Sequence, residues 1–358
     1  MRASRRLFAL VWLSLSQVIL NPLLTKEGVE GGRTAAAFST PSLVGRGTVP
    51  HAAPQLSVGW LMGSLAQATS GDTRQYREAE GFHPPRTISL APSVTEILFA
   101  LGAGDEVVGV STYCDYPPEV TRIKRVGTFL TPNVEEIVAL RPDLIIGVPT
   151  PGNEGPVRSL QSLGLKVVIV GGDTMRQMRE SIDVIAQAIG RAGAGRDLLE
   201  RLDARLAAVR ERVRDAPARR VLMVVGQKPL VAVGSGTFPD ELIRMAGGIN
   251  VAGGTALAWP HVNIESVIAW APEVIIDTSM GTEESPRTLE FWKQFPSLPA
   301  VRDHRVYGYR SYQLLRPGPR ITEALDALAR AIHPERFEGS VQSPNFGPWT
   351  LDFGRCLS

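Results

Sequence analysis

The chain of 358 residues has few cysteines, and it lacks the short motifs of the commonest enzyme classes. Its two cysteines, Cys114 and Cys356, form no C-x-x-C pair, and a chain of this size needs no disulfide to fold. There is no G-x-x-x-x-G-K-[ST] phosphate loop, no H-E-x-x-H zinc motif and no G-x-S-x-G nucleophile turn. We therefore expect a protein that is not an enzyme and that needs no cofactor.

The sequence also lacks a long apolar run and a strong charge of one sign. Its apolar run Leu7–Leu20 is too short for a typical membrane span. The formal charge is +2, and residues 1–85 hold eight Lys or Arg against five Asp or Glu. The basic balance thus belongs to the N-terminal tail, and no basic surface indicates a nucleic-acid partner.

The N-terminal tail has the layout of a secretory signal. Three arginines within the first six residues precede Leu7–Leu20, as in the charged and apolar regions of a signal peptide. A second apolar run, Leu56–Leu65, precedes an A-x-A cleavage pattern at 66–68. Because two signals in series are unusual, we expect translation to start downstream of Met1 and the mature periplasmic chain to begin near Thr69. A disordered extension is the alternative.

An internal repeat is the most informative feature of the sequence. Residues 132–146 (PNVEEIVALRPDLII) resemble residues 262–276 (VNIESVIAWAPEVII), with matched positions 130 residues apart. Each copy begins with an asparagine suited to cap a helix, Asn133 or Asn263. An apolar-faced helix follows and ends at a proline, and then comes a β-branched run typical of a buried parallel strand.

A weaker repeat lies upstream, since 86–104 and 219–248 each read as a strand followed by a helix that ends at glycine. Strands that alternate with helices predict parallel sheets with helices on their faces. We therefore predict an α/β fold of two similar lobes. The expected division is a signal tail at 1–68, a lead-in at 69–85, an N-terminal lobe at 86–172, connecting helices at 173–217, a C-terminal lobe at 218–335 and a tail at 336–358.

The connecting region predicts two helices with glycines between them. Gly190, Gly193 and Gly195 interrupt the helical pattern, and a second helix is expected from Gly195 to Asp215. Such a helix would be about 30 Å long at 1.5 Å per residue. A single long helix is a stiff connector, so we expect small hinge motion and a ligand site that is largely formed in advance.

Three segments resemble the helical-backbone class of periplasmic binding proteins: 111–120 (STYCDYPPEV), 126–146 and 258–276. The resemblance covers residues 86–335 and is strongest to the cobalamin-binding members, with haem and iron-siderophore binders as relatives. It implies a monomeric solute-binding protein that delivers cobalamin or another corrinoid to the dimeric permease of an ABC importer. Haem or a ferric siderophore is the alternative ligand.

The same resemblance implies a docking role for two glutamates. Glu135 and Glu265, which are matched positions of the repeat, correspond to family residues that contact arginines of the two permease subunits. A two-fold symmetric partner needs two equivalent contacts, and charge-assisted pairs fix orientation. Alternatively, both acids only complement the positive ends of their helices.

Four residues of the N-terminal lobe are candidates for the ligand site. A macrocycle needs broad aromatic faces and a few polar anchors. Tyr113, Asp115 and Tyr116 lie in a loop that Pro117 and its neighbour keep extended, and Phe129 matches a family position that stacks on the corrin. The alternative for the tyrosines is that they cover the edge of a core.

The candidates of the C-terminal lobe are Trp259, His261, Tyr312 and Arg316. Trp259 has no periodic place in a helix or strand, which favours a contact surface over core packing. Arg316 matches a family arginine that binds polar amides, although it could instead cap the nearby turn, and Tyr312 matches a polar contact. His261 is a hydrogen-bonding candidate, with ligation of a metal centre as the alternative. Trp270 lies inside the repeated helix and is expected to pack in the core.

Two positions depart from the pattern of the cobalamin binders. Val148 and Val231 stand where those proteins present Trp and Phe. The loss of two aromatic faces weakens the corrinoid assignment more than it weakens the transport assignment.

Overall fold

The computed structural model describes residues 83–150, 152–279, 290–309, 314–337 and 349–350. The expected signal tail and cleavage site, Cys356 and most of the expected C-terminal tail lie outside these ranges. Among the described helices, none combines the length and the apolar character that crossing a membrane requires.

Strands and helices alternate along the N-terminal half. In chain order its elements are β1 (Thr87–Ser89), α3 (Pro92–Ala100), a 3-10 helix (Gly104–Glu106), β2 (Val107–Val110), a 3-10 helix (Pro118–Arg122), α4 (Val134–Ala139), β3 (Leu144–Gly147), α5 (Glu154–Ser162) and β4 (Val167–Ile169). The four strands form one parallel sheet in the order β2-β1-β3-β4. All residues of β1 and β3 are buried, as the apolar sequence of a covered parallel strand requires.

The C-terminal half repeats this plan with additions. Its elements are β5 (Arg219–Gln227), β6 (Leu230–Ala232), α8 (Phe238–Met245), β7 (Gly248–Asn250), α9 (Ile264–Trp270), β8 (Val274–Asp277), a 3-10 helix (Trp292–Gln294), α11 (Pro299–Arg302), β9 (Val306–Gly308), α13 (Ile321–Ile332), a 3-10 helix (Pro334–Arg336) and β10 (Trp349–Thr350). The sheet order is β10-β9-β8-β5-β6, and β7 also pairs with β5. Strands β6 and β10 are antiparallel to their neighbours, and the other pairs are parallel.

The predicted repeat forms equivalent structures in the two halves. The side chain of Asn133 accepts a hydrogen bond of 3.1 Å from the backbone N–H of Glu136, which caps α4. Asn263 caps α9 in the same way, with a bond of 2.8 Å from Ser266. These caps satisfy backbone donors that would otherwise lack a partner. Each helix leads into a buried parallel strand, β3 or β8.

Matched hydrogen bonds of two arginines hold the end of each repeated helix. The backbone N–H of Arg86 donates to Asp143 Oδ2 at 2.8 Å, and that of Arg220 donates to Glu273 Oε2 at 2.9 Å. Both guanidinium groups also donate to carbonyl groups at the end of the neighbouring helix, α4 or α9. Such bonds satisfy the last carbonyls of a helix, so both helices are fixed at each end.

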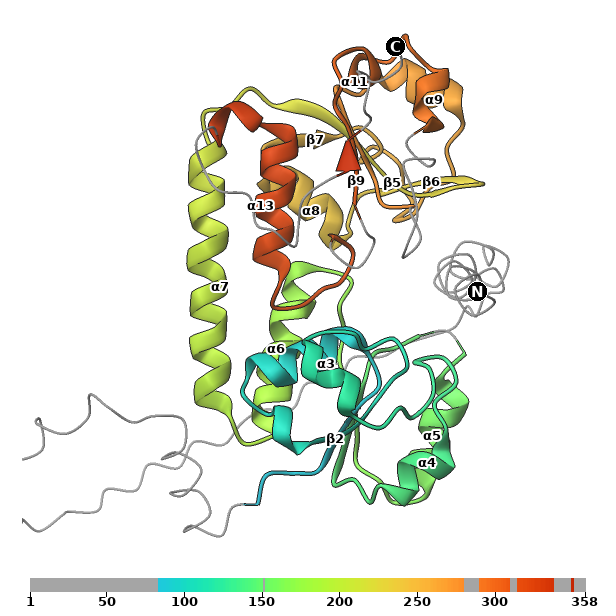
Figure 1. Cartoon of the computed structure of the whole chain (residues 1–358), viewed down its shortest axis with the longest axis vertical. Coiled ribbons are helices and arrows are strands. Elements are labelled where there is room, and N and C mark those ends of the chain that lie inside the picture. The colour runs from blue at the N-terminus through green and yellow to red at the C-terminus, as the bar shows by residue number, and fades with distance from the viewer. Residues whose placement is uncertain (1–82, 151, 280–289, 310–313, 338–348, 351–358) are drawn as a thin grey trace, which may run out of the picture. The chain divides into compact units, whose positions relative to one another are not determined.

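The connector consists of α6 (Met175–Ala188) and α7 (Ala192–Val213). Gly190 ends α6 in the left-handed region at φ 69°, but the expectation that Gly193 and Gly195 also interrupt the helix was wrong. Gly195 instead allows close contact between the helices, because an added Cβ would lie 2.6 Å from that of Ala186. Helix α7 spans about 33 Å and runs beside both lobes (Figure 1).

One large apolar cluster joins the two lobes and the connector. It includes Val94 of α3, Met178 of α6, Leu202 of α7, Met223 of β5 and Leu328 of α13. Each sheet has one smaller cluster on its other side. In the N-terminal half this cluster lies beneath α4 and α5, and in the C-terminal half it lies beneath α9 and α11. The predicted fold class is confirmed, with two mostly parallel sheets, flanking helices and a long connecting helix.

Candidate functional site

Loops at the carboxyl ends of strands from both lobes meet at an ion-pair cluster. Asp115 lies in the loop after β2, and Arg316 lies between β9 and α13. Nη1 of Arg316 donates to Asp115 Oδ1 at 2.7 Å and to Glu96 Oε1 of α3 at 2.8 Å. Loops in this position form the ligand sites of α/β sheets, so the cluster marks the candidate site.

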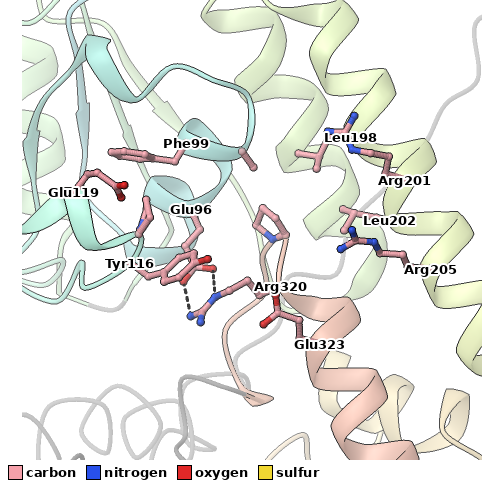
Figure 2. A pocket seen from close by; sticks show the side chains of 13 residues that line it. Glu96, Phe99, Tyr116, Glu119, Leu198, Arg201, Leu202, Arg205, Arg320 and Glu323 are labelled. Atoms are coloured by element: carbon pink, nitrogen blue, oxygen red, sulfur yellow. Dashed lines mark hydrogen bonds and ion pairs between the residues drawn. The ribbon is translucent and has the colours of Figure 1, made fainter. Parts of the chain in front are cut away.

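A second arginine completes the cluster. Arg320 Nε donates to Glu96 Oε2 at 3.0 Å, and Nη2 donates to Oε1 at 3.0 Å, which is a bidentate pair. The guanidinium carbon of Arg320 lies 4.1 Å from the centroid of the Tyr116 ring, within the range of a cation–π contact. Figure 2 shows the side chain of Arg320 beside Glu96 and the ring of Tyr116.

Hydrogen bonds from arginine hold both carboxylates of this cluster. Glu96 is only 4% exposed, and both of its carboxylate oxygens accept hydrogen bonds from arginine. Burial lowers the pKa of Arg316, but Glu96 and Asp115 outweigh this effect and raise the pKa above its ordinary value. Two carboxylates and two guanidinium groups therefore share one network, in which Asp115 is the exposed member with 54% of its side chain accessible.

A cavity of about 420 Å³ lies beside the cluster, towards α7. It is lined by Glu96, Phe99, Ala100, Tyr116, Pro117, Glu119, Leu198, Arg201, Leu202, Arg205, Pro319, Arg320 and Glu323 (Figure 2). Of the predicted ligand residues that the structure describes, only Tyr116 lines this cavity. Tyr116 and Pro117, which directly follow Asp115 in the chain, bring the loop that carries Asp115 to the wall of this cavity.

Two predicted aromatic residues of the N-terminal lobe lie together. The rings of Tyr113 and Phe129 have centroids 5.3 Å apart and are tilted by 58°. The backbone carbonyl of Phe129 accepts a bond of 3.3 Å from the buried Asn153 side chain, which fixes this loop. Burial raises the pKa of Tyr113, so its phenol is neutral at physiological pH. The pair offers a rigid, partly exposed aromatic surface.

The loop that holds Tyr113, Asp115 and Tyr116 is not helical, as expected. Pro117 is extended at φ −68° and ψ 173°, and a 3-10 helix begins only after it, at Pro118–Arg122. A proline at the first position of a helix loses no hydrogen bond, so Pro118 can begin this helix.

Trp259 and His261 lie along the edge of the C-terminal sheet. The carbonyl of Pro260 accepts a hydrogen bond of 3.0 Å from the last residue of β6, Ala232. The carbonyl of Ala258 accepts one of 2.8 Å from the backbone N–H two residues later. Trp259, between them, is half-buried and packs against the large apolar cluster, while His261 is exposed. Trp270 packs against a core cluster, as predicted. Tyr312 lies outside the described residues.

Glu135 and Glu265 occupy the first turns of α4 and α9, and both side chains are exposed. Ile137 and Val267, on the opposite faces of these helices, are fully buried. The two acids therefore project from equivalent positions on the two lobes. The helix N-termini favour them electrostatically, which is compatible with a second role.

Sequence reasoning missed Glu96 and Arg320. Glu96 stands within the apolar segment SVTEILFA, and a buried carboxylate needs a cationic partner. The segment RPGPR places two arginines four residues apart, which was the available signal for such partners. Within the described ranges, no three His, Cys, Asp or Glu side chains are grouped so that they could hold a metal ion.

Comparison with known proteins places this chain in a family. Residues 88–313 match the model of the family described as periplasmic binding protein. The vitamin B12-binding protein of Vibrio cholerae is 30% identical over 251 residues, which cover 70% of this chain and 90% of that protein. The uncharacterized ABC transporter substrate-binding lipoprotein YvrC of Bacillus subtilis is 28% identical over 262 residues, covering 71% and 82%.

A solved structure of a binding protein has a similar fold. The periplasmic haem-binding protein RhuT from Roseiflexus has a TM-score of 0.64 and 29% identity, with 71% of this chain and 100% of that chain covered. The family consists of substrate-binding proteins, which carry a transported ligand and not a catalytic cofactor, and which are not enzymes. The chain belongs to the periplasmic binding protein family.

Proposed function

We propose that this chain is the extracytoplasmic binding protein of an ABC importer and that it carries cobalamin or another corrinoid. It is secreted, acts as a monomer, holds the ligand non-covalently between its lobes and delivers it to a dimeric permease. The similarity to a vitamin B12-binding protein over 90% of that protein's length supports the ligand class. The similarity to an ABC transporter substrate-binding lipoprotein supports the transport role.

The observation that carries the ligand assignment is the pairing of Arg316 with two carboxylates. Haem has two propionate carboxylates, and proteins hold a carboxylate most strongly with an available cationic group. Here Arg316 already binds two carboxylates, and Arg320 binds Glu96 in a bidentate pair. The amide side chains of a corrin instead carry N–H groups, which can donate hydrogen bonds to the exposed carboxylate of Asp115.

The apolar walls of the proposed site come from both lobes. The Tyr113–Phe129 pair and the half-buried Trp259 would contact the faces of the macrocycle, and Tyr116 would contact its edge. Val231 is 3% exposed, so it offers no surface that replaces an aromatic ring. Compared with the cobalamin binders, the proposed site therefore has fewer aromatic contacts and depends more on polar contacts.

Haem is the second candidate, because a haem-binding protein shares this fold at 29% identity. Tyr116, at 39% exposure, and the exposed His261 imidazole carry atoms that can ligate haem iron. At this cluster, a propionate would have to displace a carboxylate partner of Arg316 or Arg320, which has an energetic cost.

Calorimetry of the secreted chain with cyanocobalamin, a corrinoid precursor and haemin tests the assignment. We expect one corrinoid per chain and at least about tenfold weaker binding of haemin, equivalent to about 1.4 kcal/mol. Tighter binding of haemin than of both corrinoids would overturn the ligand assignment while leaving the transport role intact.

We further propose that Glu135 and Glu265 dock the protein onto the two permease subunits. Their exposure and their equivalent positions on two capped helices support this role. The double variant Glu135→Lys/Glu265→Lys should lose ligand uptake and keep its calorimetric ligand affinity. Unchanged uptake by this variant would contradict docking by these residues.

A further inference from the structure

Each repeated helix exposes an aliphatic side chain one turn after its glutamate. Val138 of α4 is 43% exposed, and Ile268 of α9 is 45% exposed. Val138 follows Glu135 by three residues, and Ile268 follows Glu265 by three residues. Residues three apart lie on one face of a helix, so each aliphatic side chain lies beside the acid.

Single exposed aliphatic residues are ordinary and by themselves indicate nothing. The matched spacing is the distinguishing observation, because Val138 and Ile268 are 130 residues apart, as are the two glutamates. The other large hydrophobic side chains exposed in the described part of the chain form no pair at this spacing; they are Tyr116, Leu163, Ile169, Val184, Ile249 and Leu257.

The fold supports both side chains rigidly. The fully buried neighbours Ile137 and Val267 anchor the inner faces of the two helices, and the asparagine caps fix their starts. The exposed faces are therefore formed before any partner arrives, which lowers the entropic cost of association. In Figure 1 both α4 and α9 lie on the side of the molecule away from α7.

We propose that Val138 and Ile268 are apolar docking contacts, each inserting into an apolar depression beside a basic group on one subunit of the permease dimer. This inference rests on the proposed docking role of Glu135 and Glu265. A two-fold symmetric dimer is the occupant, because only a partner with two equivalent surfaces matches two equivalent acid-and-aliphatic faces on one chain. The carboxylates steer and orient the encounter, whereas the aliphatic side chains slow dissociation.

The test measures binding of the full ligand-loaded chain to the permease dimer of the same organism in lipid nanodiscs. Val138→Ser/Ile268→Ser should raise the dissociation rate about tenfold and leave the salt dependence of the association rate unchanged. Leu163→Ser/Val184→Ser, which removes two exposed aliphatic side chains elsewhere, should leave both rates unchanged. Circular dichroism and ligand calorimetry confirm that each variant is folded.

Comparison with the charge-reversal variant separates the two proposals. If Glu135→Lys/Glu265→Lys leaves permease binding unchanged, the docking role fails and the apolar contacts fail with it. If charge reversal abolishes binding but Val138→Ser/Ile268→Ser behaves like the control pair, only the apolar contacts are refuted. A changed salt dependence in the serine variant would also refute them, because it would indicate disturbed acids rather than lost apolar contact.

Discussion

Glu96 Oε1 accepts a hydrogen bond of 2.8 Å from Nη1 of Arg316, which lies 220 residues further along the chain. Glu96 belongs to α3 of the N-terminal lobe, and Arg316 lies between β9 and α13 of the C-terminal lobe. A buried carboxylate without a cation would be strongly unfavourable, so the pair couples the position of one lobe to that of the other. It also holds Arg316 beside Asp115, at the candidate ligand site.

The first prediction concerns the stability of this junction. Glu96→Gln leaves two guanidinium groups without their shared carboxylate, and breaking a buried ion pair from one side should lower the free energy of unfolding by about 3 kcal/mol. Urea denaturation followed by tryptophan fluorescence measures the change. Glu119→Gln, an exposed residue that lines the same cavity, is the matched control and should change stability by less than about 0.5 kcal/mol. Equal effects of the two substitutions would contradict the assigned role of Glu96.

The second prediction concerns ligand choice. Asp115→Asn removes the exposed carboxylate and one partner of Arg316, while it conserves the size of the side chain. Affinity for cyanocobalamin should fall about tenfold, since a hydrogen bond to a charged group contributes about 1.5 kcal/mol or more. Affinity for haemin should rise, because Arg316 becomes more available to a propionate. Calorimetry with both ligands measures the crossover, and a parallel loss of both affinities would argue against the proposed charge selection.

The sequence predicts those parts of the fold that depend on neighbouring residues. Asn133 and Asn263 cap helices because a cap needs only a side chain three residues from its donor. The helix-to-strand units at 132–146 and 262–276 follow for the same reason, as does the packing of Trp270. Local patterns also predicted the parallel sheets and hence the fold class.

Contacts between distant segments escaped prediction. The partners of Glu96 are more than 200 residues away, so its position in an apolar helix indicated only that some cation must lie near. Gly195 was read as a helix breaker because propensity treats glycine alone, whereas packing against Ala186 decides its role. The hairpin of β5 and β6 was also missed, since Lys228-Pro229 was not recognised as a turn between strands.

The third prediction concerns pH. Burial raises the pKa of Glu323 above its ordinary value, Glu96 raises it further, and Arg320 and Arg205 lower it. A carboxyl group with a raised pKa in the folded state contributes its stability below the unfolded pKa, and this contribution is lost as the pH rises through the folded pKa. Glu323→Gln should thus be more stable than the wild type at pH 7, by about 0.5 kcal/mol after allowance for solvent screening.

The test is to repeat the urea denaturation of wild type and Glu323→Gln between pH 4 and pH 7. The advantage of the variant should vanish at pH 4, where Glu323 is largely protonated in both folded and unfolded chains. An advantage that stays constant with pH would show that the substitution acts through packing and not through the carboxyl charge.

The fourth prediction concerns the contact between the connecting helices. Gly195→Ala places a methyl group 2.6 Å from Cβ of Ala186, so α6 and α7 must separate, which should cost about 2 kcal/mol of unfolding free energy in spite of the better helix propensity of alanine. Gly193→Ala, two residues earlier in the same helix, meets only the end of the Arg196 side chain at 4.0 Å. It should stabilise the protein by about 0.5 kcal/mol, because alanine lowers the entropy of the unfolded chain. Thermal denaturation of both variants measures the two signs, and a stabilising Gly195→Ala would mean that α6 and α7 are not in tight contact at this position.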